Sequence, residues 1–388
     1  MAETILSLDK ILKQIPVIKT TTNYWMLRAD GGKFFTDFFI NSYIGIGWNE
    51  ISVADIKEID DEEELKERLK QSNTEIETVI VTNENGGVSE EEVSTSPSQR
   101  SVASWASQLL RFVNSVKVGD IVIVPNEGSS LFNAFIVTKS AYDESQSTIN
   151  EQNQNRDYKH SEFKKRIGVS FIKNFSRRES DSAIYPLIYS HHTLTDANEY
   201  KTFLNRAIFD VYIENELLHA TFQVTETNTI GARSINQFLS GIIATTDELF
   251  EDEDVDLKIN VQSPGPAEIA MYTSVGIVVI AVIVVGIHSI FGGKLSIGKG
   301  DNIKVDIDSK GILESLDQHK ARKLDNEKKQ LQNIAEGIEK AKSLNVPFSA
   351  LGIEVPEGIT KVIDNAIITD KAQKNAIVDN NDVDTDND

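Results

Sequence analysis

The segment Ile269–Phe291 constrains this chain more than any other, because 23 consecutive residues there carry no formal charge. A helix of that length rises about 1.5 Å per residue, which matches a hydrocarbon core of about 30 Å. A helix buried in a protein core is the alternative, but such a helix has a polar face and this segment is apolar all round. We therefore expect one transmembrane helix over residues 269–291.

The residues that flank this segment give conflicting indications of topology. Lys294 and Lys299 follow it while acidic residues precede it, which favours a cytoplasmic C-terminal part. The first twenty residues lack the pattern of a secretory signal, which favours a cytoplasmic N-terminal part. A single spanning helix cannot satisfy both. We expect the inner membrane of a cell with a cytoplasmic N-terminal sensor, and the side of the C-terminal part stays open.

Composition and motifs argue against several classes of function. The net charge of −21 argues against general nucleic-acid binding, and the absence of cysteine excludes disulfides and thiolate chemistry. Walker A, Gly-x-Ser-x-Gly and Gly-x-Gly-x-x-Gly motifs are absent. His191 and His192 are adjacent, so they point to opposite sides of a strand, and no third ligand lies at zinc spacing. We expect no enzyme, no catalytic residue, no metal and no cofactor.

Changes in composition divide the chain into five regions. Residues 72–99 are polar and rich in turn formers, so we expect most of that region to be a long surface loop, with a candidate strand over Thr78–Thr82. Leu324, Leu331 and Ile338 fall seven residues apart, which is a short coiled-coil pattern. Such a helix more often packs on its own domain, but next to a single membrane helix the pattern favours self-association. The expected regions are a sensor domain over 1–245, an acidic and proline-rich linker over 246–268, the transmembrane helix over 269–291, a small β-hairpin with a helical assembly region over 292–378, and a disordered acidic tail over 379–388.

Four short motifs follow one another in the first half of the chain. They are Tyr24-Trp25-x-x-Arg28, Gly45-Ile-Gly-Trp48-Asn49, Arg111-Phe112-Val113 and Gly119-Asp120-Ile-Val-Ile-Val-Pro125. Together they resemble the N-terminal domain of Mrr-type restriction proteins, which is related to the EVE and PUA-like β-barrels. The chain departs from that family in having no C-terminal nuclease signature. The resemblance implies an α+β fold with a strongly bent sheet, and a cleft that holds a nucleobase or a short nucleic acid.

Aromatic and basic residues within these motifs are the candidates for ligand binding. Trp48 and Trp25 offer flat faces on which a base can stack, whereas polar side chains could read its edge. For each of Tyr24, Trp25 and Trp48 taken singly, a place in the core of a barrel is the better expectation. The candidate ligand-binding residues are Tyr24, Trp25, Arg28, Trp48, Asn49, Arg111, Asn126, Lys164, Lys165 and Arg166.

A basic island contrasts with the acidic background of the chain. From Arg156 to Arg178 there are eight Lys or Arg residues against two acids, and Lys164, Lys165 and Arg166 lie at its centre. Such an island is typical of an anion-binding site. A solvated surface that pairs with the chain's own acids is an equal alternative, and the sequence does not decide between the two.

These observations together predict a ligand-controlled membrane effector. The sensor would bind a nucleotide or short single-stranded nucleic acid, and four or more copies in a homo-oligomer would gather their helices in the lipid bilayer into an ion channel. The architecture resembles membrane effectors of bacterial anti-phage (antiviral) defence, Hailong-type systems among them, which implies a nucleotide-synthesising enzyme as partner. The alternative is a membrane-tethered reader that conducts nothing. The polar residues expected to face the pore are Thr273, Ser274, His288 and Ser289.

Overall fold

The computed structural model describes residues 4–7, 13–59, 61–82, 88–154, 157–178, 180–190, 192–215, 217–224, 236, 256–259, 265–272, 303–306, 353–354 and 357–369. The chain divides into two compact units. One unit is continuous, Thr21–Ile208, and the other combines Met1–Thr20 with Phe209–Asp388. The continuous unit ends earlier in the chain than the sensor domain expected over 1–245.

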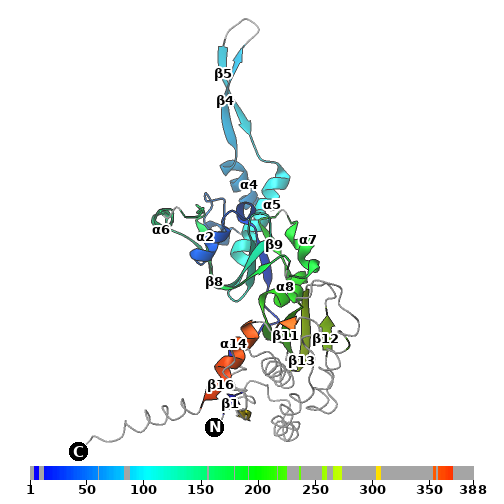
Figure 1. Cartoon of the computed structure of the whole chain (residues 1–388). Coiled ribbons are helices and arrows are strands. Elements are labelled where there is room, and N and C mark those ends of the chain that lie inside the picture. Colours follow the sequence, from blue (N-terminus) through cyan, green and yellow to red (C-terminus); the bar gives the residue numbers. More distant parts are fainter. Residues whose placement is uncertain are drawn as a thin grey trace, which may run out of the picture. The chain divides into compact units, whose positions relative to one another are not determined.

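A six-stranded sheet curls into a half-barrel within residues 21–208 (Figure 1). Its strand order is β3-β8-β7-β6-β2-β9, and only β2 and β6 run parallel. Three register shifts interrupt the pairing of the long strands β7 and β8, and bulges of this kind bend a sheet. The strands are β2 (Tyr24–Leu27), β3 (Tyr43–Ile46), β6 (Ile121–Pro125), β7 (Leu131–Asp143), β8 (Lys165–Ser176) and β9 (Leu194–Asp196).

Short helices connect the strands, and several of them begin at a side chain that caps the first turn. Ser52 and Asp55 form a reciprocal capping box at α3 (Val53–Glu58). Asp61 caps α4 (Glu62–Ser72), and Ser98 caps α5 (Gln99–Leu110). The other elements of this unit are η1 (Ala29–Gly32), α2 (Phe35–Ile40), η2 (Arg111–Ser115), α6 (Gln146–Gln152), η3 (Ser182–Ile184), α7 (Tyr185–Ile188), η4 (Asn198–Tyr200) and α8 (Lys201–Ile208).

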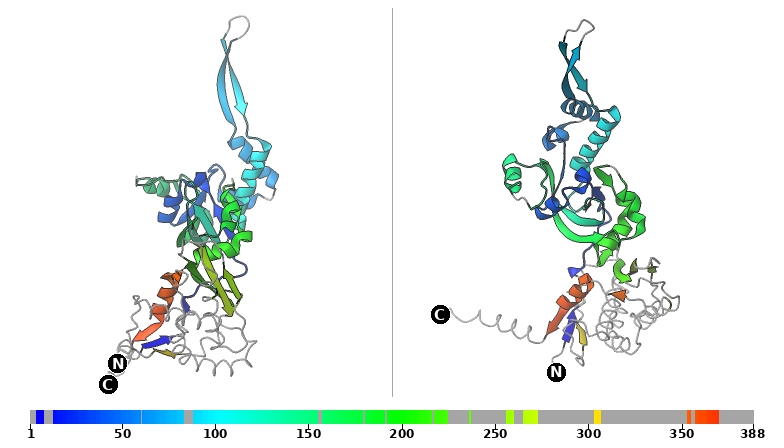
Figure 2. Two further views of the ribbon diagram at one scale, coloured as in Figure 1. Left: turned by 45° about the vertical axis from the view of Figure 1, so that its right-hand side comes forward. Right: turned by 45° about the horizontal axis from the view of Figure 1, so that its top comes forward.

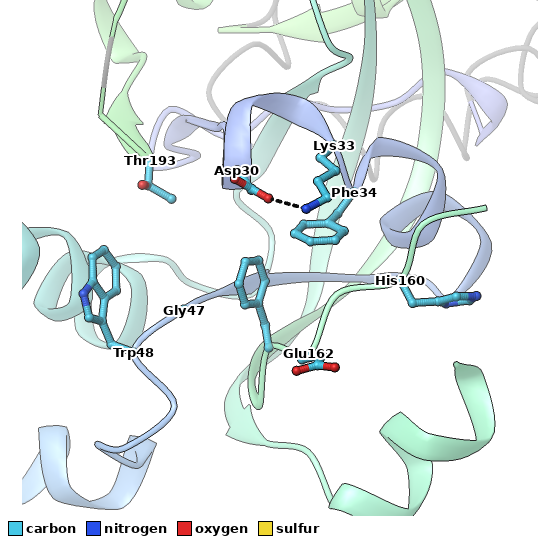
Figure 3. A pocket seen from close by; sticks show the side chains of 9 residues that line it. Asp30, Lys33, Phe34, Gly47, Trp48, His160, Glu162 and Thr193 are labelled. Carbon is cyan, nitrogen blue, oxygen red and sulfur yellow. Dashed lines mark hydrogen bonds and ion pairs between the residues drawn. The ribbon is translucent and has the colours of Figure 1, made fainter. Parts of the chain in front are cut away.

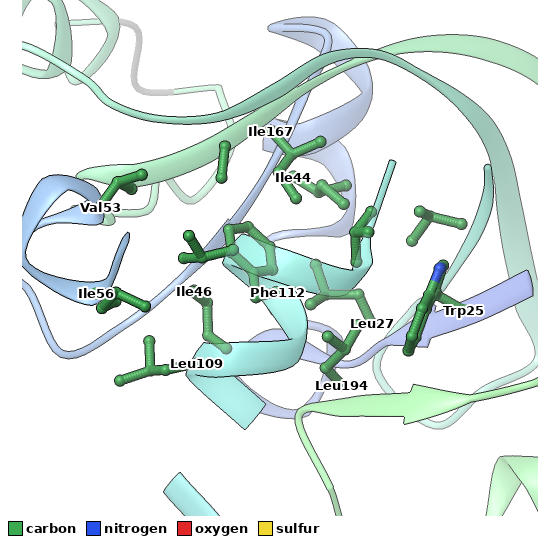
Figure 4. Packing of buried hydrophobic residues seen from close by; sticks show 14 of the residues in the cluster. Trp25, Leu27, Ile44, Ile46, Val53, Ile56, Leu109, Phe112, Ile167 and Leu194 are labelled. Atoms are coloured by element: carbon green, nitrogen blue, oxygen red, sulfur yellow. The ribbon is translucent and has the colours of Figure 1, made fainter. Parts of the chain in front are cut away.

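The hydrophobic core of this unit lies between the curled sheet and the helices α3, α4 and α5 (Figure 4). Phe112, from the π-helical turn η2, is fully buried among residues from strands and helices. Because α5 and η2 contribute Leu109 and Phe112 to this core, they fix the helical layer against the sheet. The same core also holds Trp25.

The region expected to be a long surface loop, residues 72–99, is instead mostly a β-hairpin (Figure 2). Strands β4 (Glu75–Thr82) and β5 (Val88–Thr95) pair in antiparallel register from Glu75–Thr95 to Thr82–Val88. The run Thr78–Thr82 is rich in β-branched residues, which suits a strand, and β5 supplies the partner. The strand expected at Thr78–Thr82 is therefore present, and the expectation of a loop for the rest was wrong because the acid-rich partner strand has no apolar pattern.

The second unit contains two sheets whose strands come from distant parts of the chain. One has the order β10-β11-β13-β12, with β15 also paired to β11, and the other has the order β14-β1-β16. Helix α14 (Glu357–Ala366) precedes β16 directly. The strands are β1 (Thr4–Ser7), β10 (Val211–Glu214), β11 (Leu217–Val224), β12 (Asp256–Ile259), β13 (Gly265–Tyr272), β14 (Ile303–Asp306), β15 (Ile353–Glu354) and β16 (Ile367–Thr369).

The predicted transmembrane helix over Ile269–Phe291 is wrong. Its first four residues, Ile269–Tyr272, belong to β13, whose backbone pairs with both β11 and β12. Across the part of the chain that the structure describes, no helix has both the length and the apolarity needed to cross a membrane. The remaining residues, 273–291, lie outside the described part. The classification as a membrane protein and ion channel rested on this helix and falls with it.

Most of the other predictions for the C-terminal part concern residues that the structure does not describe. Thr273, Ser274, His288 and Ser289 lie outside the described residues. So do residues 312–344, which contain the coiled-coil pattern, and the acidic tail over 379–388. Within 292–378, β14 pairs in parallel with β1.

Candidate functional site

A cavity of about 550 Å³ is the candidate functional site of the unit formed by residues 21–208 (Figure 3). Four stretches of chain bring residues to it: η1 with the residues that lead into α2, the end of β3, the segment before β8, and the loop before β9. In Figure 3, Trp48 stands at one side of the site and His160 at the opposite side. The lining residues are Asp30, Lys33, Phe34, Gly47, Trp48, His160, Glu162, Phe163 and Thr193.

Three aromatic side chains supply the flat surfaces of this cavity. Phe34 and Phe163 meet edge to face, with ring centroids 5.2 Å apart and planes at 80°. Trp48 is half-buried and packs against Trp105 of α5 at a centroid distance of 5.8 Å. Phe34 is buried at 7% exposed, whereas the rings of Trp48 and Phe163 are partly exposed, so solvent can reach two of the three aromatic walls.

The glycines of the Gly45-Ile-Gly47 motif make room for one of these walls. A Cβ atom at Gly45 would lie 3.1 Å from the Cβ of Phe163, and one at Gly47 would lie 3.6 Å from its ring. The segment that carries Phe163 can therefore approach the end of β3 closely, as glycine within a strand permits.

Polar groups surround the aromatic walls. Lys33 Nζ lies 3.0 Å from a carboxylate oxygen of Asp30, and both side chains are largely exposed. Thr193 is held in place because its N–H donates to Oε1 of the buried Gln108 at 2.6 Å. His160 is 8% exposed at its side chain, and its Nδ1 lies 3.3 Å from Oδ1 of Asp37. The cavity thus combines hydrogen-bond donors and acceptors with flat apolar surfaces.

Two lining residues hold a left-handed backbone conformation that side chains rarely adopt. Asp30 has a φ of 49° and Trp48 has a φ of 57°. Such conformations cost about 1–3 kcal/mol each, and they concentrate at binding and catalytic sites. They persist only where the surrounding contacts fix them. At Trp48 the fixing contact is a buried lysine.

Lys165 is fully buried and donates from Nζ to the carbonyl oxygens of Trp48 and Ile51, the latter at 2.7 Å. Burial lowers the pKa of Lys165 to about 8, against the opposing effect of Asp143 and Glu50. Its ammonium group therefore holds the loop that carries Trp48. Buried in this way, the side chain of Lys165 does not face a ligand.

Arg166, the next residue of the predicted basic island, is also buried. Its Nε donates to the carbonyl of Phe163 at 2.9 Å, its Nη1 donates to Gln152 at 2.8 Å, and its guanidinium lies 3.8 Å from the ring centroid of Tyr43. Lys164 is half-buried, and its backbone N–H donates to Asn49 Oδ1 at 3.0 Å. The three residues at the centre of the island therefore hold the segments that line the cavity, and they do not line it themselves.

Three of the predicted ligand-binding residues lie in or beside the core. Tyr24 is fully buried, and its hydroxyl donates to Asn205. Trp25 is 5% exposed and donates from Nε1 to Asp120 at 2.9 Å. Arg28 donates from Nη2 to Ser129 Oγ at 2.8 Å, and desolvation lowers its pKa. None of these three lines the cavity.

The remaining predicted residues occupy different positions. Asn49 follows Trp48, and its side-chain amide donates to the carbonyl of Glu162 at 2.8 Å, so it fixes the segment that carries Phe163. Asn126 closes the turn between β6 and β7 by accepting from the N–H of Ser130 at 2.9 Å. Arg111 is exposed at the start of η2. Of the ten candidates, Trp48 alone lines the cavity, with Asn49 directly behind it.

Most residues of the cavity escaped the sequence analysis. Phe34 stands in an apolar helical stretch, and Phe163 stands beside a basic run, so neither has a local signal of function. The pair Gly31-Gly32 marks a turn that places Asp30 and Lys33 at the cavity, which is the one signal available. Groups of three or more His, Cys, Asp or Glu suited to a metal ion do not occur among the residues that the structure describes.

No family model, no curated protein and no solved structure matches this chain. The resemblance to the EVE and PUA-like barrels therefore stays a prediction. A curled β half-barrel is compatible with a PUA-like fold. Function is accordingly inferred from the geometry of the cavity.

Proposed function

We propose that residues 21–208 form a binding module that holds a nucleobase in the cavity beside Trp48. The ligand would be a nucleotide or a short single-stranded nucleic acid. The observation that carries this proposal is the set of aromatic walls, Phe34 with the partly exposed Trp48 and Phe163, around a cavity of about 550 Å³. Small-molecule sites typically enclose about 300–1,000 Å³ and combine apolar walls with a few polar groups.

Stacking supplies the general attraction in this proposal. Every base has a flat π face, and one base stacked on an aromatic side chain contributes about 1–3 kcal/mol. The left-handed backbone at Trp48, fixed by Lys165, presents the indole in advance of binding. Such preorganisation reduces the entropy that a ligand must lose.

The polar residues would read the edge of the base. Asp30 offers a carboxylate acceptor, Lys33 a donor, and Thr193 a hydroxyl that does both. The ion pair between Asp30 and Lys33 is exposed, so it contributes little stability and can open for a ligand at small cost. The base would then exchange hydrogen bonds with both partners.

An enzyme is the second candidate, and one contact favours it. His160 lines the cavity and has Asp37 at 3.3 Å, the arrangement by which a carboxylate orients an imidazole that acts as a general base. Tyr43 and the N–H of Ser161 also donate to Asp37, which holds the carboxylate in place. A hydrolytic role would consume the ligand, whereas a binding module would return it unchanged.

Calorimetric titration of the full chain with the four nucleoside 5′-monophosphates tests the proposal. We expect one of them to bind, and Trp48→Ala to weaken that binding by about 5- to 150-fold through the loss of stacking. Phe39→Ala is the matched control, because Phe39 is an exposed aromatic residue outside the cavity. Chromatography of the ligand after incubation separates the candidates, since turnover would identify an enzyme. Equal affinity of Trp48→Ala and the parent chain would contradict the proposal.

A further inference from the structure

An arginine beside two tyrosines forms an exposed platform at the end of β8. Tyr189 is 64% exposed, although large aromatic side chains are usually buried. Arg177 donates from Nη2 to its hydroxyl at 3.1 Å. The same guanidinium lies 4.4 Å from the ring centroid of Tyr185 and 5.8 Å from that of Tyr189. We call these three residues the Arg177 platform.

Arg28 connects this platform to the cavity. Its backbone N–H donates to the carbonyl of Thr193 at 2.7 Å, and its guanidinium donates to the carbonyl of Ile188, the neighbour of Tyr189. Arg28 also lies two residues before Asp30, which lines the cavity. Because Thr193 follows Tyr189 closely in the chain, their Cα atoms are at most about 14 Å apart. A ligand that leaves the cavity past Thr193 therefore reaches the platform within a short distance.

Two consecutive arginines lie at the platform, although the whole chain carries −21 and Glu179 follows them in the sequence. Arg177 is followed by the exposed Arg178. Two acids of the adjoining loops already have basic partners: Asp181 faces Arg206 at 3.4 Å, and Glu127 faces Lys159 at 3.6 Å. Guanidinium groups beside an accessible aromatic ring suit a phosphate with its attached base.

We infer that the Arg177 platform is a second subsite, which holds the next nucleotide of a single strand whose first base occupies the cavity. Tyr189 stacks on the second base, and Arg177 contacts the phosphate that joins the two nucleotides. The inference rests on the proposed function of the cavity, and it defines the ligand as an oligonucleotide. A mononucleotide would use only the first of the two subsites.

The length of the ligand separates the two subsites experimentally. Fluorescence titration of the full chain would compare the four nucleoside 5′-monophosphates with the four matching homotetranucleotides. We expect the tetranucleotide of the preferred base to bind about 5- to 150-fold more tightly than its monophosphate, which is the stacking of one further base. The gain should shrink as salt rises, because part of it comes from a phosphate contact.

Variants then assign this gain to the platform. Tyr189→Ala and Arg177→Gln should abolish most of the gain with length and leave the affinity for the monophosphate unchanged. Lys139→Ala is the matched control, because Lys139 also holds a cation over a tyrosine ring, that of Tyr142, at 3.6 Å. Circular dichroism of each variant checks that it is folded.

The outcomes distinguish the inference from the proposed function. Monophosphate binding without a gain with length, or with a gain that survives Tyr189→Ala in a folded variant, overturns the second subsite and leaves the cavity proposal in place. Failure of all four monophosphates and all four tetranucleotides to bind overturns both. Loss of the gain in the two platform variants, with Lys139→Ala unchanged, establishes the subsite.

Discussion

Trp25 and Trp48 carry the same side chain in neighbouring motifs, yet the structure gives them different surroundings. Trp25 is 5% exposed in the core, and its indole N–H donates to the buried Asp120. Trp48 is half-buried, lines the cavity and has a φ of 57°. A sequence pattern cannot predict which of the two is buried, because the exposure of each depends on whether its end of the strand is covered in the folded chain.

We predict opposite effects of truncating these two residues. Trp25→Ala should lower the free energy of unfolding by about 3–5 kcal/mol, the usual cost of emptying a large aromatic site in a core. Trp48→Ala should cost no more than about 2 kcal/mol, because its ring is only partly buried. Denaturant unfolding of both variants measures the difference. A larger loss for Trp48→Ala would make Trp48 a core residue.

The buried Lys165 should make the stability of the chain depend on pH. Its pKa is about 8 in the folded chain against 10.5 for an ordinary lysine, so between these values the unfolded chain binds more protons. The free energy of unfolding should therefore rise with pH through this window, by about 2–3 kcal/mol between pH 7 and pH 10. Lys165→Met lacks this contribution, so the difference in free energy of unfolding between the parent chain and this variant should change by that amount between the two pH values. Urea unfolding of both proteins at both pH values measures this difference. A difference that stays constant with pH would contradict the burial of an ionisable lysine.

At the scale of elements, the turn η1 positions one side of the cavity. Gly32 has a φ of 93° and packs so closely on the end of β6 that a Cβ atom would lie 2.6 Å from the carbonyl carbon of Asn126. Only glycine allows this approach. Asp30 and Lys33 flank the same turn, so the approach determines where the polar side of the cavity lies.

Gly32→Ala should therefore lower both stability and ligand affinity. A side chain in the left-handed region costs about 1–2 kcal/mol, and the contact with Asn126 adds to this cost. Gly119→Ala is the matched control, because Gly119 has the same φ of 93° and an added Cβ atom there would meet nothing within 4 Å. Gly32→Ala should be the more destabilising of the two in thermal melts. Equal losses of melting temperature in the two variants would show that the close approach of Gly32 to Asn126 is unimportant.

Local patterns predicted some elements and missed others for a physical reason. A short antiparallel pair such as Ile121–Pro125 with its partner strand β7 can be predicted from a local pattern, because the pairing depends on nearby residues. The stretch Ile269–Tyr272 was predicted as the start of the helix over Ile269–Phe291, from the length and apolarity of that whole segment. It is a strand because β11 and β12 pair with it along its backbone. The partners lie too far away in the sequence for a local pattern to reveal them.

The candidate site was less predictable than the half-barrel. Trp48 and Asn49 were found through their motif, but the residues that face Trp48 across the cavity come from three other stretches. Phe34 and Phe163 form an edge-to-face pair although they lie far apart in the sequence. Lys165 was identified as a ligand-binding residue, whereas it holds the Trp48 loop from within. Basic residues in a run do not reveal which of them point inwards.

At the scale of the whole molecule, the continuous unit has a sheet and a core that are complete within residues 21–208. We predict that this stretch, produced alone, unfolds in a single cooperative transition and binds the same nucleotide as the full chain. Calorimetry of residues 21–208 measures both properties. A fragment without a cooperative transition would show that this unit depends on the rest of the chain.

The other unit depends on both ends of the chain. Strand β1, at residues 4–7, pairs with β14 and β16, which follow about 300 residues later or more. Closing so long a loop is slow, so we expect this unit to gain its native sheet later than residues 21–208 during refolding. Hydrogen exchange pulsed during refolding measures the order of protection. Earlier protection of β1 than of β6 would contradict it.

The central claim is that the cavity beside Trp48 holds a nucleobase, and saturation-transfer NMR of the full chain tests it most directly. With protein protons saturated in a mixture of the four nucleoside 5′-monophosphates, we predict transfer chiefly to the base protons of one nucleotide, because its ring lies between aromatic side chains. In Trp48→Ala this transfer should fall sharply, and in Phe39→Ala it should stay. Transfer to the sugar protons alone, or base transfer that is unchanged in Trp48→Ala, would contradict the account.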